Sequence, residues 1–306
     1  MTITEPGIYT MTAEEYHADA CPEPSLSRGI AHMLILQSPM HAHYHHPRLG
    51  GGKSSDANKA MDAGSAVHSM VLGVGAEVVP LKAVYGPKHE RAGEPVTDYA
   101  TKDAKTKRDA LREAGHIPCL AHELADLRRC AASITRNLRW HQDGADFFGP
   151  GQSEAVVIWK EGSVWMRCMV DRLPDDPSAP PFDLKLTKMS AAPTDWERRY
   201  RTAYAFQDAF YRRGIAAIRG RMPPPMRFAV GEINPPHGVS VMCSAPSLAA
   251  LSEADVKRSI NIWSRCMASG EWPGYPQFTA HVEATSWQIS QAEEAAMRED
   301  IMEAAQ

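Results

Sequence analysis

Cysteine is scarce in this chain of 306 residues, and the cysteines present are poorly spaced for metal clusters or cross-links. There are six, widely separated, and no pair has the C-x-x-C spacing of a zinc-ligand or redox motif. A zinc site and a disulfide framework are therefore not expected. Free thiols in a reducing cytoplasm are the simpler interpretation.

Long apolar runs are also missing. No uninterrupted apolar stretch approaches membrane-spanning length, so we expect no membrane partner. The N-terminal stretch MTITEPGIYTMTAEEY lacks the apolar centre of a signal peptide, which again favours a cytoplasmic protein.

Net positive charge is absent as well, since the formal net charge is −4. A protein that coats nucleic acid through overall charge is excluded, and any contact with DNA must use a local basic surface. The stretch from Gly50 to Ser55 has the composition of a flexible linker, not of a helix start. A phosphate loop needs a helix at that point, so ATP binding is not supported and no nucleotide cofactor is expected.

The chain does contain enough apolar material for a sizeable core, with 43% hydrophobic and 23% charged residues. Capping boxes predict three helix starts, at Thr12 with Glu15, Thr194 with Glu197, and Ser290 with Glu293. Apolar spacing and caps together predict helices at residues 13–18, 26–37, 60–72, 102–114, 120–140, 194–218, 252–267 and 290–304, and one beginning at Ser38-Pro39.

Strands are predicted three times between residues 154 and 185, and again at 228–233 and 239–243. The order helix, three strands, helix, two strands predicts an α/β fold in which helices flank a mixed central sheet. We expect a single domain with an N-terminal helical arm (1–59), a core (60–245) and a C-terminal helical segment (246–306).

Two acids and a lysine fall on neighbouring predicted strands. Asp183 and Lys185 are two residues apart, so their side chains lie on one face of a strand. Asp171 ends the preceding strand and can join them. Two carboxylates and an ammonium that converge at a sheet edge suit a site that holds a hard divalent cation and activates water.

The same acids belong to a series of motifs spread along the chain. In order, these are Gly64-Ser65-Ala66-Val67-His68, Glu154, Val170-Asp171-Arg172, Asp183-Leu184-Lys185 and Gln207-Asp208-Ala209-Phe210-Tyr211. The series resembles the PD-(D/E)XK nucleases, and within them the exonuclease VIII (RecE-type) nuclease domain of phages and prophages. Gly7-Ile8-Tyr9 and Trp272-Pro273-Gly274-Tyr275 also resemble that branch, so the resemblance extends over nearly the whole chain. It implies a restriction-endonuclease-like core.

The resemblance implies a metal site with one or two ions. Asp171 and Asp183 would be ligands, His68 would complete the site of one ion, and the Leu184 backbone carbonyl would contribute. Oxygen ligands suit Mg²⁺ or Mn²⁺, and an imidazole favours tolerance of Mn²⁺. The short-spaced cysteine triad of the iron–sulfur relatives is absent near the C-terminus, so no iron–sulfur cluster is expected.

Catalytic roles are implied for further residues. Lys185 would position the attacking water and help to deprotonate it, and Glu154 would orient that water or Lys185. Gln207 would hold the nucleophile or a phosphate oxygen, and Tyr211 would contact a neighbouring phosphate.

A basic stretch follows, from Arg198 to Arg221, with seven arginines against one acid. Such a cluster beside a nuclease site would hold the DNA backbone, and a solvent-exposed helix face is the alternative interpretation. The residues favoured as DNA contacts precede Gln207 or follow Asp171, and are Arg198, Arg199, Arg201 and Arg172.

Two positions depart from the family pattern. Met169 stands where this branch often has Arg, with Arg167 two residues before it, and Leu186 stands where Thr or Ser is common. Neither change removes a ligand, but both affect expected phosphate contacts.

The resemblance implies 5′→3′ digestion of linear double-stranded DNA in the cytoplasm of a bacterial host, leaving 3′ single-stranded tails for recombination. It also implies a ring-shaped homo-oligomer, a trimer or tetramer, and a partner single-strand annealing protein. The alternatives are an endonuclease or repair nuclease on the same fold, and a catalytically silent protein that binds DNA ends.

Overall fold

The computed structural model describes residues 3–51 and 62–304. The chain divides into two compact units, Met1–Gly274 and Tyr275–Gln306. Most of the predicted linker and the first two residues of the helix predicted at 60–72 lie outside the described residues. None of the described helices combines the length and hydrophobicity needed to cross a bilayer.

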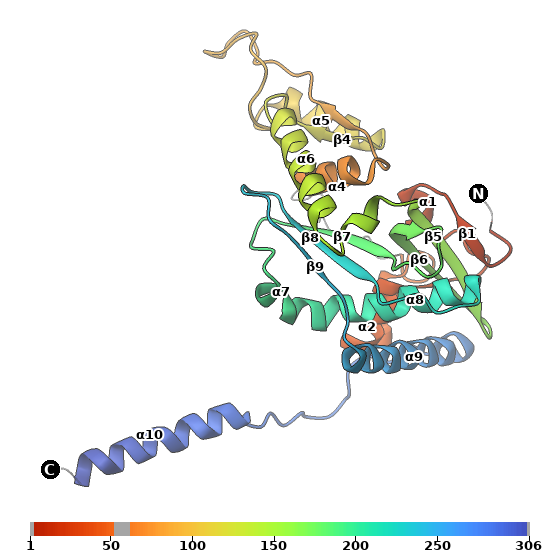
Figure 1. Ribbon diagram of the computed structural model, residues 1–306, viewed down its shortest axis with the longest axis vertical. Coiled ribbons are helices and arrows are strands. Elements are labelled where there is room, and N and C mark those ends of the chain that lie inside the picture. Colours follow the sequence, from red (N-terminus) through yellow and green to blue (C-terminus); the bar gives the residue numbers. More distant parts are fainter. Residues whose placement is uncertain (1–2, 52–61, 305–306) are drawn as a thin grey trace. The chain divides into compact units, whose positions relative to one another are not determined.

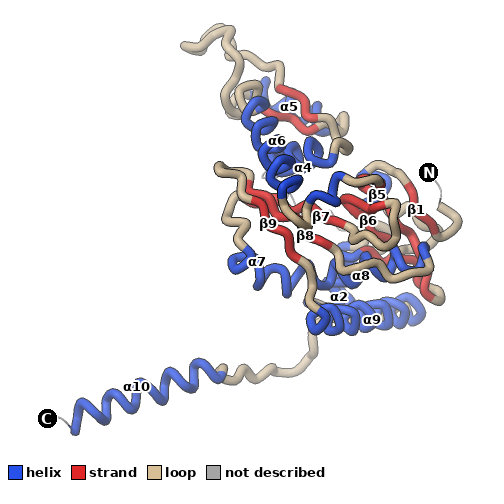
Figure 2. Tube along the Cα trace, in the orientation of Figure 1, coloured by secondary structure: helices blue, strands red, loops and turns tan. Residues whose placement is uncertain are grey.

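The first unit is built on a mixed sheet (Figure 2). Its strand order is β1-β5-β6-β7-β8-β9, and β2 pairs with β6. The β7–β8 and β2–β6 pairs are parallel, whereas the other pairs are antiparallel. The strands are β1 (Gly7–Tyr9), β2 (Leu26–Ser27), β5 (Gly151–Glu161), β6 (Val164–Pro174), β7 (Phe182–Thr187), β8 (Arg227–Glu232) and β9 (Val239–Met242). The predicted mixed sheet is thus confirmed.

Helices cover both faces of this sheet (Figure 1). Helices α2, α8 and α9 pack on one face, and α4 and α6 pack on the other. The helices of this unit are α1 (Ala13–His17), α2 (Arg28–Leu36), α3 (Pro39–His45), α4 (Asp62–Leu72), α5 (Lys102–Glu113), α6 (Leu124–Trp140), α7 (Pro193–Arg199), α8 (Ala205–Arg219) and α9 (Pro246–Ser269). Beside α5, a small parallel sheet of β3 (Val78–Pro80) and β4 (Ile117–Cys119) was not predicted.

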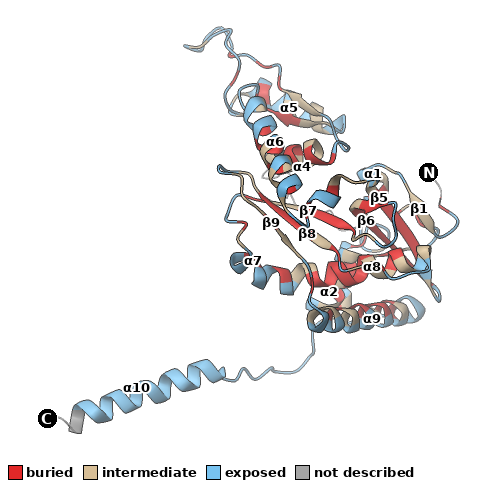
Figure 3. Ribbon diagram, in the orientation of Figure 1, coloured by how far each residue is buried: buried red, intermediate tan, exposed pale blue. Residues whose placement is uncertain are grey.

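Two hydrophobic clusters fill the spaces between the sheet and its helices, and both the strands and the helices contribute buried residues to them (Figure 3). Alternation along β7 sends Phe182 and Leu184 into the cluster beneath α4 and α6. Asp183, between them, lies on the opposite face with α8. Strand β7 is therefore fixed from both sides by packing.

Gly214 of α8 allows that helix to approach β5 closely. A Cβ atom at this position would lie 2.6 Å from the ring of the fully buried Trp159. We expect Gly214→Ala to lower the free energy of unfolding by about 1–2 kcal/mol, because overpacking outweighs the gain of about 1 kcal/mol in helix propensity.

Denaturant unfolding measures this change. Gly29→Ala in α2 is the control, since no atom lies within 4 Å of the added Cβ and only the propensity gain remains. Equal stability changes in the two variants would contradict the packing argument.

Five helix starts among the described residues differ from the predictions. The helix predicted at 120–140 begins at Leu124, and the helix predicted at 252–267 begins six residues earlier, at Pro246. Residues Leu26–Ser27 form β2, so the helix predicted from 26 begins at Arg28. The Thr194–Glu197 box is wrong because the helix starts one residue earlier, at Pro193, without a side-chain cap. Proline at the first helical position fixes the starting backbone angle instead.

The second unit contains α10 (Ser286–Ala304). The predicted Ser290–Glu293 box is wrong, because the same pattern occurs five residues earlier. Thr285 Oγ1 accepts a hydrogen bond from the Gln288 amide (3.3 Å), and Gln288 Oε1 accepts one from the Thr285 amide (2.9 Å). Glutamine serves at the third helical position as well as glutamate does.

The first predicted box is confirmed. Glu15 N donates to Thr12 Oγ1 (3.2 Å), and Thr12 N donates to Glu15 Oε2 (2.9 Å), at the start of α1. The Ser38 cap with Pro39 at the first helical position is also confirmed, at the start of α3. These local signals depend on neighbouring residues alone, which is why the sequence reveals them.

Candidate active site

The predicted acids meet at the point where β6 and β7 part. The register places Arg172 of β6 opposite Phe182 of β7. At the position next to this pair, β6 carries Asp171 and β7 carries Asp183. The Leu184 backbone amide donates a hydrogen bond to Asp171 Oδ2 (2.7 Å). The Asp171 side chain thus links β6 to β7 at this position. The antiparallel register thus brings residues twelve positions apart to one opening.

Helix α4 adds His68 to this opening. His68 Nε2 lies 3.0 Å from Asp171 Oδ2. Burial lowers the pKa of His68, but the hydrogen bond and negative charge of Asp171 outweigh it and leave the pKa raised. Burial acts to raise the pKa of Asp171, and the His68 contact and the Lys185 charge outweigh it and hold the pKa below its ordinary value. The contact between His68 and Asp171 therefore shifts both pKa values in the direction that favours the charged form.

Asp183 is the most deeply buried acid of the site, with 2% of its surface exposed. It forms an ion pair with Lys185 and accepts a hydrogen bond from Gln207 Nε2. Burial, followed by the charge of Asp171, raises the pKa of Asp183 to about 6. Burial lowers the pKa of Lys185, but the two aspartates outweigh it and leave the pKa raised. Asp183 and Lys185 thus project together as predicted, whereas Gln207, predicted to hold the nucleophile or a phosphate oxygen, contacts Asp183.

Glu154 joins the site from β5 with an unusual backbone. The β5–β6 register places it beside Asp171, between the Ser153–Arg172 and Ala155–Val170 pairs. Its φ of 50° lies in the left-handed region, which non-glycine residues rarely adopt. Burial raises the pKa of its carboxyl. Such strain typically persists at functional sites because the surrounding structure imposes it.

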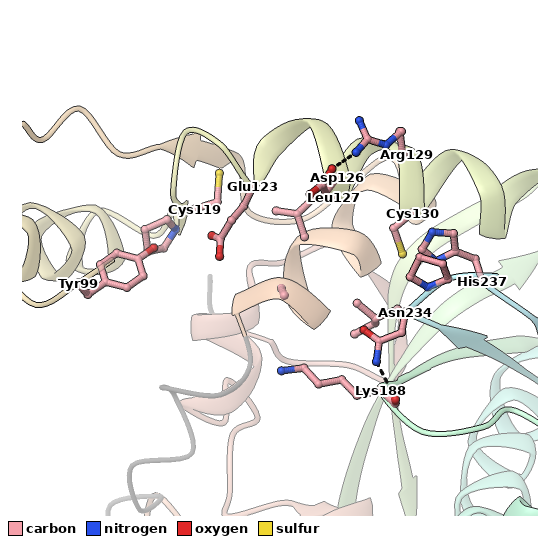
Figure 4. Close-up of a pocket in the computed structure, with 14 residues that line it drawn as sticks. Tyr99, Cys119, Glu123, Asp126, Leu127, Arg129, Cys130, Lys188, Asn234 and His237 are labelled. Atoms are coloured by element: carbon pink, nitrogen blue, oxygen red, sulfur yellow. Dashed lines mark hydrogen bonds and ion pairs between the residues drawn. The ribbon is translucent and has the colours of Figure 1, made fainter. Parts of the chain in front are cut away.

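A cleft of about 740 Å³ lies on the side of the site that carries His68 and Glu154. His68 and Glu154 line it, together with Lys188 from the loop after β7. A second cavity of about 550 Å³ lies between α6 and the β8–β9 turn and also contains Lys188 (Figure 4). There the Asn234 side chain donates to the Lys188 carbonyl (3.0 Å), which fixes the loop at the rim shared by both hollows.

The donor set fits a hard divalent cation, although the described residues contain no preassembled group of three or more metal-ligating side chains. Asp183 Oδ1 is buried, and Lys185 is its ionic partner. Asp171 supplies a second carboxylate, and His68 an imidazole that contacts it. Carboxylate oxygens are the ligands that Mg²⁺ and Mn²⁺ prefer. The ligand roles of His68 and the Leu184 carbonyl remain predictions.

The arginines favoured as DNA contacts occupy different settings. Arg198, Arg199 and Arg201 are exposed at the end of α7 and in the turn after it. Arg199 lies over the Trp196 ring (5.2 Å), and Arg201 pairs with Glu197. Their exposure leaves them accessible to a phosphate backbone, and the contact itself remains a prediction.

Arg172 and Tyr211 are engaged within the protein. Arg172 donates to the Gly149 carbonyl and to Ser153 Oγ (3.2 Å). Tyr211 is 9% exposed and packs in the cluster beneath α8. These settings show structural roles for both side chains, and their roles as phosphate contacts remain predictions.

The sequence motifs missed one residue that contacts Lys185. Tyr204 places its ring over Lys185, with Nζ 5.2 Å from the ring centroid. The spacing of three residues between Tyr204 and Gln207 was the available signal, because residues three apart share a helix face.

Comparison with known proteins agrees with this fold. The sequence matches the family described as "PDDEXK-like domain of unknown function (DUF3799)" over residues 35–284. No curated protein sequence matches the chain. The crystal structure of a candidate exonuclease from Eubacterium rectale is similar, with a TM-score of 0.52 and 12% identity over 91% of this chain and 97% of that one. At this identity the likeness shows the fold. PD-(D/E)XK nucleases generally use divalent metals. The chain belongs to this PDDEXK-like family.

Proposed function

We propose that the protein is a metal-dependent exodeoxyribonuclease that degrades linear double-stranded DNA. The observation that carries this proposal is the meeting of Asp171, Asp183 and Lys185 where β6 and β7 part. The order of motifs along the chain and the similar structure named as a candidate exonuclease support the exonuclease class.

The two aspartates would hold Mg²⁺ or Mn²⁺, which lowers the pKa of bound water and neutralises phosphate charge. Lys185 would direct its ammonium to the attacking water and to the charge that develops on the phosphate. Gln207 holds Asp183 in place, which fixes the carboxylate before substrate arrives. Glu154, whose pKa is raised by burial, would accept a hydrogen bond from that water.

We further propose 5′→3′ polarity, 3′ single-stranded products, and a ring-shaped trimer or tetramer that acts with a single-strand annealing protein in the bacterial cytoplasm. The resemblance of the motif series to RecE-type nucleases supports these points. A ring would retain DNA without ATP, because topology rather than affinity would hold the substrate. Light scattering on the purified protein tests the ring, and a strict monomer would exclude it.

Digestion of linear duplexes labelled at the 5′ or the 3′ end tests the activity. With Mg²⁺ or Mn²⁺, we expect early release of the 5′ label as mononucleotide and retention of the 3′ label on long single strands. A covalently closed circle of the same sequence is the control and should survive. Cutting of the circle would identify an endonuclease instead, and metal-independent binding without cleavage would identify a silent end-binding protein.

A further inference from the structure

The ring of Tyr204 gives Lys185 a second partner beside Asp183. Lys185 Nζ is 5.2 Å from the ring centroid and lies over its face. A lysine ammonium in this position is attracted by the π electrons of the tyrosine. Lys185 is therefore held by two different elements, since Asp183 shares its strand and Tyr204 precedes α8.

Other aromatic rings fix the orientation of the Tyr204 ring. It stacks on Trp196 with centroids 5.7 Å apart and an interplanar angle of 15°. It also stacks on Phe228 of β8, at 5.5 Å and 30°. Trp196 is itself held, because its Nε1 donates to the Ser190 carbonyl (2.9 Å). The Tyr204 ring therefore cannot rotate its face away from Lys185 without breaking its stacking with Trp196 and Phe228.

The backbone that presents Tyr204 is also specialised. Residues Tyr200–Tyr204 form a π-helical turn between α7 and α8. Such turns are rare in proteins, and those that occur often lie at functional sites. Arg28 of α2 donates Nη2 to the Ala203 carbonyl within this turn (2.7 Å). The helix predicted as continuous over 194–218 is interrupted here, and the interruption sets Tyr204 against both Lys185 and Phe228.

We propose that Tyr204 is a positioning residue that holds the Lys185 ammonium at the reacting centre. Asp183 is also expected to hold the divalent cation. The negative charge of Asp183 would then be shared between the cation and Lys185, and it would attract the Lys185 ammonium less strongly. The aromatic face does not depend on that charge, so it keeps Lys185 in place when Asp183 is engaged. The effect on rate rests on the proposed nuclease function, whereas the contact itself does not.

Nuclear magnetic resonance of protein labelled with ¹³C-lysine tests the contact without activity. The Lys185 Cε–Hε signals, assigned through Lys185→Arg, should be shifted upfield and show cross-relaxation with the Tyr204 ring protons. Tyr204→Phe should keep the shift, and Tyr204→Leu should lose it. Lys160, whose Nζ lies 5.4 Å from the Trp165 centroid, is the internal reference and should keep its signals in both variants. Absence of the cross-relaxation in the unmodified protein would overturn the proposal, whether or not the variants fold.

Kinetics test the role of the contact. A pair of this type is worth a rate factor of roughly 2 to 30, so we expect Tyr204→Leu to lower kcat by that factor with KM nearly unchanged. Tyr204→Phe should retain kcat, because the ring face remains. Trp165→Leu, which removes a similar lysine–aromatic pair in the β5–β6 hairpin, should leave kcat unchanged. An equal loss in Tyr204→Phe, or a change confined to KM, would overturn the positioning role. If the unmodified protein lacks nuclease activity, the proposed function fails while the resonance experiment still decides the contact.

Discussion

Lys185→Ala and Asp183→Ala should each reduce the release of nucleotides from linear duplex by on the order of 10³-fold or more. Loss of the ammonium removes both the group that positions water and a charge that stabilises the transition state, effects worth roughly 10²–10⁴ each. Loss of Asp183 removes a buried carboxylate and leaves Lys185 and Gln207 without their partner. The measurement is single-turnover cleavage of end-labelled duplex at saturating Mg²⁺ or Mn²⁺.

Lys160→Ala is the matched control for the lysine variant, because Lys160 is exposed on β5 and distant in register from the site. Its activity should equal that of the unmodified protein. Thermal unfolding must show that the Lys185 and Asp183 variants remain folded. Activity within tenfold of normal in a folded variant would remove that residue from the catalytic set.

Arg167→Ala should cause a large loss of stability. Arg167 is 3% exposed and lies 3.0 Å from Asp19 Oδ1, which is also buried. It also donates to the carbonyls of Tyr16 (3.1 Å) and Ser25 (2.8 Å), so it ties the N-terminal segment to β6. Removing one partner of a buried ion pair costs about 3–5 kcal/mol, because the other charge stays buried. At roughly 2–4 °C per kcal/mol, the midpoint of thermal unfolding should fall by roughly 6–20 °C.

Arg258→Ala is the control for the Arg167 variant, since it removes an ion pair with Asp255 in which both partners are exposed. Exposed pairs contribute at most about 1 kcal/mol, so its midpoint should hardly move. Similar midpoints for the two variants would show that burial does not make Arg167 important. The contacts of Arg167 also indicate that this residue does not compensate for the Met169 departure, because its guanidinium is held inside the protein by Asp19, Tyr16 and Ser25.

Most of the fold could be predicted from the sequence because its signals are local. The alternation Phe182, Asp183, Leu184, Lys185 specifies a strand with one apolar face, and β7 has that arrangement. Strands of two or three residues, such as β2 and β3, have no periodicity to detect. They exist because tertiary neighbours supply hydrogen-bond partners, as β6 does for Leu26.

The site was predictable to the extent that the family motifs specify it. His68 contacts Asp171, and Lys185 and Gln207 contact Asp183 on the neighbouring strand. Their catalytic and metal-binding roles remain predictions. Tyr204 was missed because it lies in the π-helical turn, where its spacing of three residues from Gln207 does not by itself place the ring over Lys185. The engagement of Arg172 with Gly149 could not be foreseen either, because that contact joins segments distant in sequence.

The backbone of Glu154 reveals a compromise between stability and chemistry. A glycine would adopt a φ of 50° without steric cost, whereas a residue with a Cβ is destabilised there by about 1–2 kcal/mol. Glycine would also remove the carboxylate that lines the cleft. The protein thus retains an acid at a position where folding alone would favour no side chain at all.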